Sequence, residues 1–208
     1  MASTPDPASQ TKGITMGSTM EGKVETHESD SRTAVPDGVI VDDFHTIDPM
    51  RFRNVLGHFP TGVVAVTTMD AENNPTGMAV GSFTSVSLDP PLVAFLPDKS
   101  SSTFPKIRTA GRFCANVLGS EQQQICRSLA RKGTDKFADV EWAPTPSGMP
   151  RIEGALAWID CEIDAVHDAG DHHIVVGRVR HLELDTPESP LIFFQGGYGG
   201  FAADRQAV

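Results

Sequence analysis

Hydrophobic and polar residues show no regular period over the first 45 residues of the chain. This stretch is rich in Ser, Thr, Asp, Gly and Pro. A segment of this composition cannot bury enough apolar surface to fold alone. We therefore expect a disordered or extended N-terminal arm over residues 1–45. The remaining residues, 46–208, are enough for one domain with its own core.

A helical period begins directly after this arm. From Phe52 to Phe59 the apolar residues stand at the spacing i, i+3, i+4 and i+7, which predicts an amphipathic helix. Asp48 or Thr46 can accept hydrogen bonds from the first helical N–H groups, and Pro60 is expected to end the helix.

Short apolar and β-branched runs, typical of strands, dominate the rest of the chain. The expected strands cover residues 62–69, 77–88, 92–96, 112–118, 155–167, 171–184 and 191–194. Two short helices are expected over residues 100–110 and 121–130, and a loop over residues 144–150. Six or seven short strands with few helices predict a mainly-β fold, closed by antiparallel connections into a small barrel.

Composition limits the function further. The formal net charge of −10 argues against a nucleic-acid surface, and no window reaches the roughly 18 apolar residues of a membrane span. The start of the chain lacks the pattern of a secretion signal, so we expect a cytoplasmic protein. Its three cysteines, Cys114, Cys126 and Cys161, form no CxxC pair and are expected to be free, buried thiols rather than catalytic groups.

Charge is unevenly distributed along the chain. Between Lys99 and Lys136 eight basic residues accompany only Glu121 and Asp135, so this segment carries 8 − 2 = +6. Residues 1–48 hold nine acidic residues against three basic ones. The basic segment is either a solvated face or the surroundings of a phosphate group.

A cluster of hydroxyl residues lies within this basic segment. It consists of Ser100, Ser101, Ser102 and Thr103. At the start of a predicted helix these residues offer hydroxyl and backbone N–H donors to an anion, or else they cap the helix without any ligand. The loop ARKGTDKF adds the cations of Arg131, Lys132 and Lys136. The two segments together favour a phosphate site.

Two other segments are candidates for ligand contact. Small residues interrupt the apolar strand pattern at Gly81-Ser82-Phe83-Thr84-Ser85, where a planar ring could approach the backbone closely, or where the strand forms a bulge or barrel corner. His172 and His173 begin another strand. Neighbouring strand residues point to opposite faces, so these two cannot readily chelate one metal, and no metal site is expected. They are either rim residues or one of them contacts a ligand.

Five segments together resemble the flavin reductase family in their order. They are FRNVLGHFPTGVVAVTT, GMAVGSFTSVSLDPPLVAF, KSSSTFPKI, AGDHHIVVGRV and PLIFFQGGYG. The resemblance covers roughly residues 45–201. It implies an FMN-binding split β-barrel homodimer that reduces FMN or FAD with NADH or NADPH. It also implies that the reduced flavin diffuses to a partner flavin-dependent monooxygenase. The only Gly-rich run, residues 196–200, is followed by no helix, so a Rossmann site is not expected.

The resemblance also implies roles for particular residues. The strand that would contact the flavin ring comprises Val80, Gly81, Ser82, Phe83, Thr84 and Ser85. Ser100 to Thr103, with Arg131 and Lys132, are similar to the segments that hold the ribityl phosphate. His172, in a Gly-Asp-His motif, is similar to a histidine on the nicotinamide side of the flavin, and Tyr198 to an aromatic residue near the same pocket.

Two other functions remain open from the sequence. Split-barrel proteins include flavoproteins that act on another substrate, such as oxidases of the pyridoxine type. They also include non-enzymatic modules that bind flavin or haem.

Overall fold

The computed structural model of the chain describes residues 47–131, 133, 135–185 and 189–202. The N-terminal arm expected over residues 1–45 lies outside these residues, and so does Lys132. No helix within the described ranges is long and apolar enough to cross a membrane.

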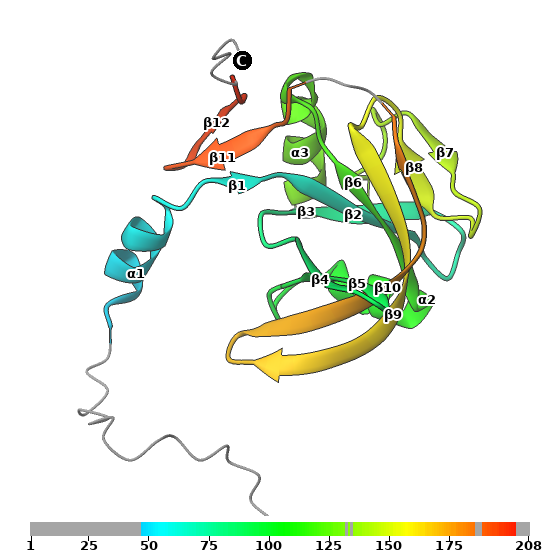
Figure 1. Cartoon of the computed structure of the whole chain (residues 1–208), viewed down its shortest axis with the longest axis horizontal. Helices are drawn as coiled ribbons and strands as arrows, with labels where there is room; N and C mark the ends of the chain where they lie inside the picture. Colours follow the sequence, from blue (N-terminus) through cyan, green and yellow to red (C-terminus); the bar gives the residue numbers. More distant parts are fainter. Residues whose placement is uncertain (1–46, 132, 134, 186–188, 203–208) are drawn as a thin grey trace, which may run out of the picture. The chain divides into compact units, whose positions relative to one another are not determined.

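The largest element is a seven-stranded sheet in which every neighbouring pair is antiparallel. Its spatial order is β3-β2-β6-β9-β10-β5-β4 (Figure 1). The strands are β2 (Val64–Met69), β3 (Pro75–Val80), β4 (Thr84–Leu88), β5 (Pro91–Phe95), β6 (Arg112–Val117), β9 (Ala157–Ala169) and β10 (His172–Leu184).

The two edges of this sheet are joined by a very short connection. β3 and β4 lie at opposite edges, yet only residues 81–83 separate them in the chain. Four Cα–Cα steps reach at most about 14 Å, whereas seven flat strands would span roughly 29 Å. The sheet therefore has to curl until its two edges approach each other, and Figure 1 shows this curvature. The result is the mainly-β fold that the strand pattern predicted, with the split-barrel-like curl that the family resemblance implied.

Both faces of strand β2 are buried. Val64 and Val66 point into a cluster with Phe95 and Phe113, which α2 (Phe104–Ala110) closes with its own apolar side chains. Ala65 points to the other face, into a second cluster covered by the helix α3 (Gln123–Ala130) and by residues 118, 152 and 191. The period of two along a strand thus divides the core into two layers.

Two smaller sheets complete the fold. The hairpin β7 (Trp142–Pro144) and β8 (Pro150–Ile152) packs on the main sheet, where Asn116 accepts a hydrogen bond from the backbone N–H of Ile152 at 2.8 Å. The second sheet has the order β1-β11-β12, formed by β1 (Thr61–Gly62), β11 (Ile192–Phe194) and β12 (Gly197–Gly199).

Several predicted element boundaries were wrong. The strand expected over residues 77–88 is two strands, because the chain crosses there from one sheet edge to the other. The helix expected over residues 100–110 begins only at Phe104, and a 3₁₀ turn, η1 (Ser120–Gln122), precedes α3. The strands β7, β8 and β12 were not predicted, since these short segments contain proline or glycine, which are typical of loops.

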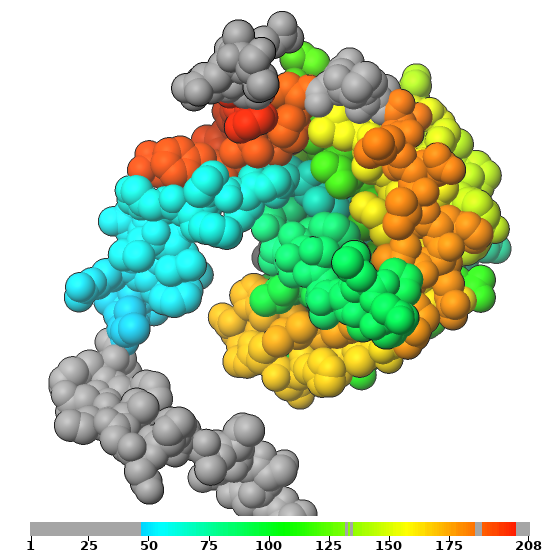
Figure 2. Space-filling model, viewed as in Figure 1, coloured from blue at the N-terminus to red at the C-terminus, as the bar shows by residue number. Residues whose placement is uncertain are grey.

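The first helix exists but has no buried residue. α1 (Pro49–Leu56) has Asp48 as its N-cap, whose carboxylate accepts hydrogen bonds from two backbone N–H groups. The helix ends at Leu56, with Gly57 as its C-cap, and not at Pro60. Its apolar residues Phe52, Val55 and Leu56 are exposed. Figure 2 shows this segment in cyan at the surface.

Candidate functional site

One cavity brings the two predicted phosphate-binding segments together. Its volume is about 450 Å³. It is lined by Met78, Ala79, Asp98, Ser100, Ser101, Ser102, Thr103, Leu129, Ala130, Arg131 and Lys136. The hydroxyl cluster comes from the loop between β5 and α2, whereas Arg131 directly follows α3. These segments are about 30 residues apart in the chain, so their meeting depends on how α3 packs against β3.

Within the hydroxyl cluster, the Ser101 side chain forms hydrogen bonds with the backbone at the start of α2. The Ser101 hydroxyl oxygen accepts hydrogen bonds from the backbone N–H groups of Thr103 and Phe104, both at 3.2 Å. Thr103 stands at the cap position of α2, but its own side chain makes no capping bond. Ser102 has no hydrogen-bond partner for its hydroxyl within the described part of the chain. The capping interpretation is therefore correct for Ser101, while Ser102 remains available to a ligand.

Asp98 is the carboxylate nearest to this cluster along the chain, and it also lines the cavity. One of its oxygens accepts a hydrogen bond from the backbone N–H of Ser100 at 2.6 Å. Hydrogen bonds from the side chain and backbone of Ser100 lower the pKa of Asp98. This carboxylate stabilises the loop that presents the hydroxyl cluster.

A buried lysine, Lys136, closes the cavity. The sequence pattern had grouped it with Arg131 and Lys132 at the expected phosphate site, whereas the family resemblance gave it no role. Lys136 is only 8% exposed. Its Nζ donates hydrogen bonds to Thr103 Oγ1 and the Leu129 carbonyl, both at 2.9 Å, and to the Gly77 carbonyl at 3.2 Å. Burial lowers the pKa of Lys136, and the nearby charge of Lys106 adds to this effect. The sequence feature that pointed to Lys136 was its place in the same loop as Arg131.

The segment expected to contact the flavin ring does not line this cavity. Gly81 and Ser82 form the corner between β3 and β4, as the alternative interpretation held. The Ser82 hydroxyl accepts a hydrogen bond from the Leu96 N–H at 3.0 Å and so ties the corner to the end of β5. Val80 is buried in the first core cluster and Phe83 packs against it. Thr84 and Ser85 are exposed on the opposite sheet edge.

The two histidines point to opposite faces of β10, as the strand geometry predicted. The His173 side chain is 16% exposed, and its ring lies 5.1 Å from that of Phe104. The His172 side chain is 41% exposed, and its Nδ1 lies 2.7 Å from a carboxylate oxygen of Asp171. That hydrogen bond lowers the pKa of Asp171. His172 is thus the accessible member of the pair.

Backbone hydrogen bonds connect this histidine hairpin to the loop of the hydroxyl cluster. The Lys99 N–H donates to the Asp171 carbonyl, and the His173 N–H donates to the Pro97 carbonyl, both at 2.9 Å. His172 does not line the cavity, but its strand begins beside Asp98. The structure therefore holds the predicted nicotinamide histidine and the predicted phosphate loop in one hydrogen-bonded unit.

Tyr198 lies apart from both groups. It belongs to β12, its hydroxyl is 3.3 Å from the Cys126 sulfur, and its ring packs edge-on against Phe193. The hydrogen bond with Cys126, together with burial, raises the pKa of Tyr198. It lines a different depression, with Pro60 and residues of β11 and β12. Within this chain, Tyr198 and the cavity do not form one site.

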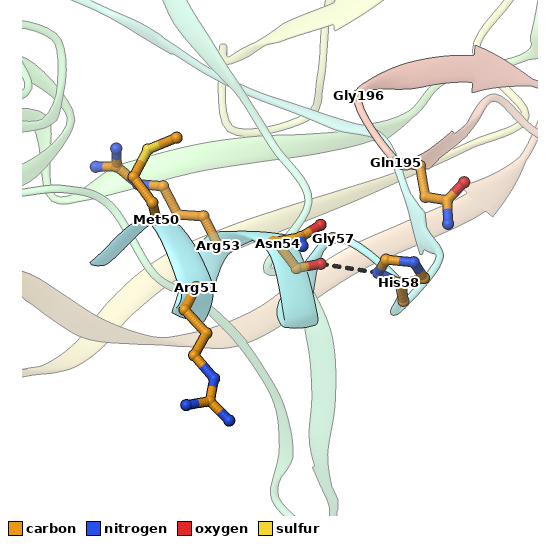
Figure 3. Close-up of a pocket in the computed structure, with 8 residues that line it drawn as sticks. All are labelled: Met50, Arg51, Arg53, Asn54, Gly57, His58, Gln195 and Gly196. Carbon is orange, nitrogen blue, oxygen red and sulfur yellow. Dashed lines mark hydrogen bonds between the residues drawn. The ribbon is translucent and has the colours of Figure 1, made fainter. Parts of the chain in front are cut away.

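A larger depression of about 800 Å³ lies between α1 and the turn at Gln195 and Gly196 (Figure 3). His58 Nδ1 donates to the Asn54 carbonyl at 2.8 Å. Arg51 and Arg53 also line it, but Figure 3 shows their side chains pointing in different directions. No converging set of charges forms here, so the smaller cavity is the better candidate.

The cysteines are free and buried, which confirms the sequence prediction. Burial raises the pKa of Cys114 strongly and that of Cys161 to about 12. Such thiols are poor nucleophiles at neutral pH. Among the described residues, no three His, Cys, Asp or Glu side chains are grouped to hold a metal ion.

The curled antiparallel sheet, with a cavity beside it that is lined by Arg131, Lys136 and the hydroxyl cluster, identifies the class as a split-barrel-like protein of mainly-β structure. Residues 56–202 match the family described as "Flavin reductase like domain". The chain belongs to this flavin reductase family, so the predicted family and the prediction of an oxidoreductase enzyme are confirmed.

Individual relatives agree with this assignment. The chain is 57% identical to a flavin reductase of Pseudomonas putida over 157 residues, 76% of this chain and 92% of that protein. It is 46% identical over 159 residues to HsaB of Rhodococcus jostii, a reductase subunit of a flavin-dependent monooxygenase, covering 76% of this chain and 81% of HsaB.

A solved structure has a similar fold. It is a homologue of nitrilotriacetate monooxygenase component B from Mycobacterium thermoresistibile, with a TM-score of 0.73 at 44% identity over 78% of this chain and 91% of that one.

Proposed function

We propose that this protein transfers a hydride from C4 of NADH or NADPH to N5 of FMN or FAD and supplies the reduced flavin to a partner flavin-dependent monooxygenase. The observation that carries this proposal is the cavity in which the hydroxyl cluster, Arg131 and Lys136 converge, in a chain of the flavin reductase family.

The residues around the cavity fit a phosphorylated flavin. A phosphate group needs hydrogen-bond donors and positive charge, and Ser102, Arg131 and Lys136 offer both. The lysine is buried without a carboxylate within 4 Å in the described part of the chain, so an anion in the cavity would compensate its charge. This is a property of the site itself and does not depend on the family.

The chain's own residues would bind and orient the reactants. The hydroxyl cluster and Arg131 would hold the anionic end of the flavin in the cavity. The ring would lie outside the cavity, against the backbone of residues 80–85. The bound flavin supplies the ring that accepts the hydride. His172, exposed on the outer face of β10, would orient the nicotinamide. No acid or base is required, since the rate then depends mainly on how closely the two rings are held.

The choice of cosubstrates is supported by the relatives. SmoA of Agrobacterium fabrum, 45% identical over 154 residues, is an FMN reductase that uses NADH. The NADH:FAD oxidoreductase SgcE6 of Streptomyces globisporus, with a TM-score of 0.72 at 34% identity over 76% of this chain and 95% of that one, was solved with NAD and FAD fragments. NADH is therefore the electron donor we propose first, with FMN and FAD both as acceptors.

A homodimer is also part of this proposal. Exposed apolar side chains lie together on α1, among them Phe52, Val55 and Leu56. Contiguous exposed apolar surface is typical of protein–protein contact. Size-exclusion chromatography with light scattering would test the dimer, and a monomeric mass would contradict it. The cytoplasmic location expected from the sequence stays a prediction.

The decisive experiment mixes the purified protein with NADH and free FMN and follows the nicotinamide absorbance, with a protein-free mixture as control. Rapid loss of the NADH band that depends on both protein and flavin would support the reductase. A yellow protein that leaves NADH unchanged would contradict it and would favour an oxidase-type flavoprotein or a non-enzymatic flavin-binding module. Replacing NADH by NADPH, and FMN by FAD, then ranks the cosubstrates.

A further inference from the structure

The ammonium group of Lys136 is buried among neutral groups. Its three hydrogen bonds go to two backbone carbonyls and one hydroxyl. No carboxylate of the described residues lies within ion-pair distance of it, whereas Lys106, which also bears positive charge, has Asp70 as a partner at 3.0 Å. Lysine is rarely this buried unless it is paired, because an uncompensated charge loses its hydration. An anion that enters the neighbouring cavity would restore the balance.

The three acceptors of Lys136 belong to the three walls of the cavity. Gly77 lies in β3 next to Met78, Leu129 lies in α3 two residues before Arg131, and Thr103 ends the hydroxyl cluster. The lysine therefore ties these walls together. It also places a positive charge behind the residues that would touch a phosphate.

The hydrogen bond to Thr103 has a further consequence. Thr103 Oγ1 accepts from Lys136, so the hydroxyl hydrogen of Thr103 remains available to donate. A threonine held in this way offers a donor to an anion. A neutral residue at position 136 could still act as a donor, but it would remove the charge.

We propose that Lys136 is a positioning residue that makes this cavity selective for phosphorylated flavins over riboflavin. The inference rests on the proposed function, since it takes flavin as the ligand of the cavity. It assigns the selectivity to charge behind the hydroxyl cluster, not to direct contact with the flavin ring.

The test compares the binding of FMN and of riboflavin, which lacks the phosphate, by quenching of flavin fluorescence. Lys136→Gln removes the charge and keeps two N–H donors, whereas Lys136→Arg keeps the charge. Lys106→Gln is the matched control, because it makes the same change at a lysine with an acidic partner. Circular dichroism checks that each variant is folded, and Lys136→Met replaces the glutamine variant if that one does not fold.

We expect Lys136→Gln to weaken FMN binding by about tenfold or more and riboflavin binding by less than about twofold. Lys136→Arg should recover most of the preference for FMN, and Lys106→Gln should keep it. Equal weakening of both flavins by Lys136→Gln would overturn the inference and leave the lysine a purely structural role, while the proposed function would stand. A wild-type protein that binds neither flavin would overturn both.

Discussion

Replacing Gly177 by alanine tests how tightly β10 is packed against the barrel core. Gly177 lies where the register between β9 and β10 shifts. A Cβ atom added there would lie 2.5 Å from Phe113 Cζ, 2.9 Å from Phe113 Cε1 and 3.3 Å from Cys161 Cβ. Phe113 is fully buried and packs edge-on against Phe95 at 5.1 Å between ring centres. The phenylalanine ring cannot move aside without disturbing the core.

The expected cost follows from these distances. Ordinary carbon contacts begin near 3.5 Å, so the ring and the new methyl group must separate by about 1 Å. Overpacking of this kind costs roughly 1–3 kcal/mol, while the lower entropy of the unfolded alanine chain returns about 0.4–1 kcal/mol. We therefore expect Gly177→Ala to lower the free energy of unfolding by about 1–2 kcal/mol, or the Tm by about 2–8 °C.

Urea unfolding in a double-mutant cycle measures this effect. Phe113→Leu removes the ring atoms that the new methyl group would meet, so Gly177→Ala should cost at least about 1 kcal/mol less in that background. Gly62→Ala is the control, because nothing lies within 4 Å of its added Cβ, so it should raise stability only by the entropy gain of about 0.4–1 kcal/mol. The reasoning is refuted if Gly177→Ala costs the same with and without the phenylalanine ring.

Three other predictions concern the site and the stability of the fold. His172→Ala should raise the KM for NADH more than it lowers the single-turnover rate, and equal losses in both parameters would contradict an orienting role. The control His181→Ala, at an exposed position further along β10, should change neither parameter. Asp160→Ala should lower the free energy of unfolding, measured in urea, by about 1–3 kcal/mol, because the buried Asp160 carboxylate accepts hydrogen bonds from the N–H and hydroxyl of Ser147. An unchanged urea midpoint would show that these bonds add nothing to stability. Hydrogen bonds from the Asn74 N–H and from Lys106 lower the pKa of Asp70, so this carboxylate stabilises the fold above its unfolded pKa and the gain is lost as pH falls through the folded pKa. Asp70→Asn should accordingly be less stable than wild type near about pH 7 and closer to it near about pH 3, and a deficit independent of pH would exclude this contribution.

The sequence predicted the parts of the site that depend on local geometry. His172 and His173 had to point to opposite faces because successive strand residues alternate, and the structure confirms this. The hydroxyl cluster was recognised from residue type alone. The expected strand over residues 77–88 wrongly ran through the corner at Gly81 and Ser82. The small residues there had indicated a barrel corner only as an alternative, and nothing local reveals that the chain crosses between the two sheet edges.

The burial of Lys136 and the place of Tyr198 were beyond sequence reasoning. In the sequence Lys136 is one of eight bases in a basic segment, and only the packing of α3 on β3 encloses it against Thr103 and Gly77. Tyr198 is flanked by glycines in the sequence, and its partner Cys126 lies 72 positions away. No local pattern records such contacts.

By itself, the sequence determined the mainly-β class, the strands with strong alternation and the family, and it predicted residues for a phosphate site. The class and the strands follow from backbone geometry and side-chain chemistry, which act over a few neighbouring residues, and the family follows from the resemblance of five ordered segments. Only the tertiary structure decided which of those residues share a cavity and which lysine is buried away from solvent. Both depend on contacts between segments far apart in the chain, formed when the short link after β3 forces the sheet to curl.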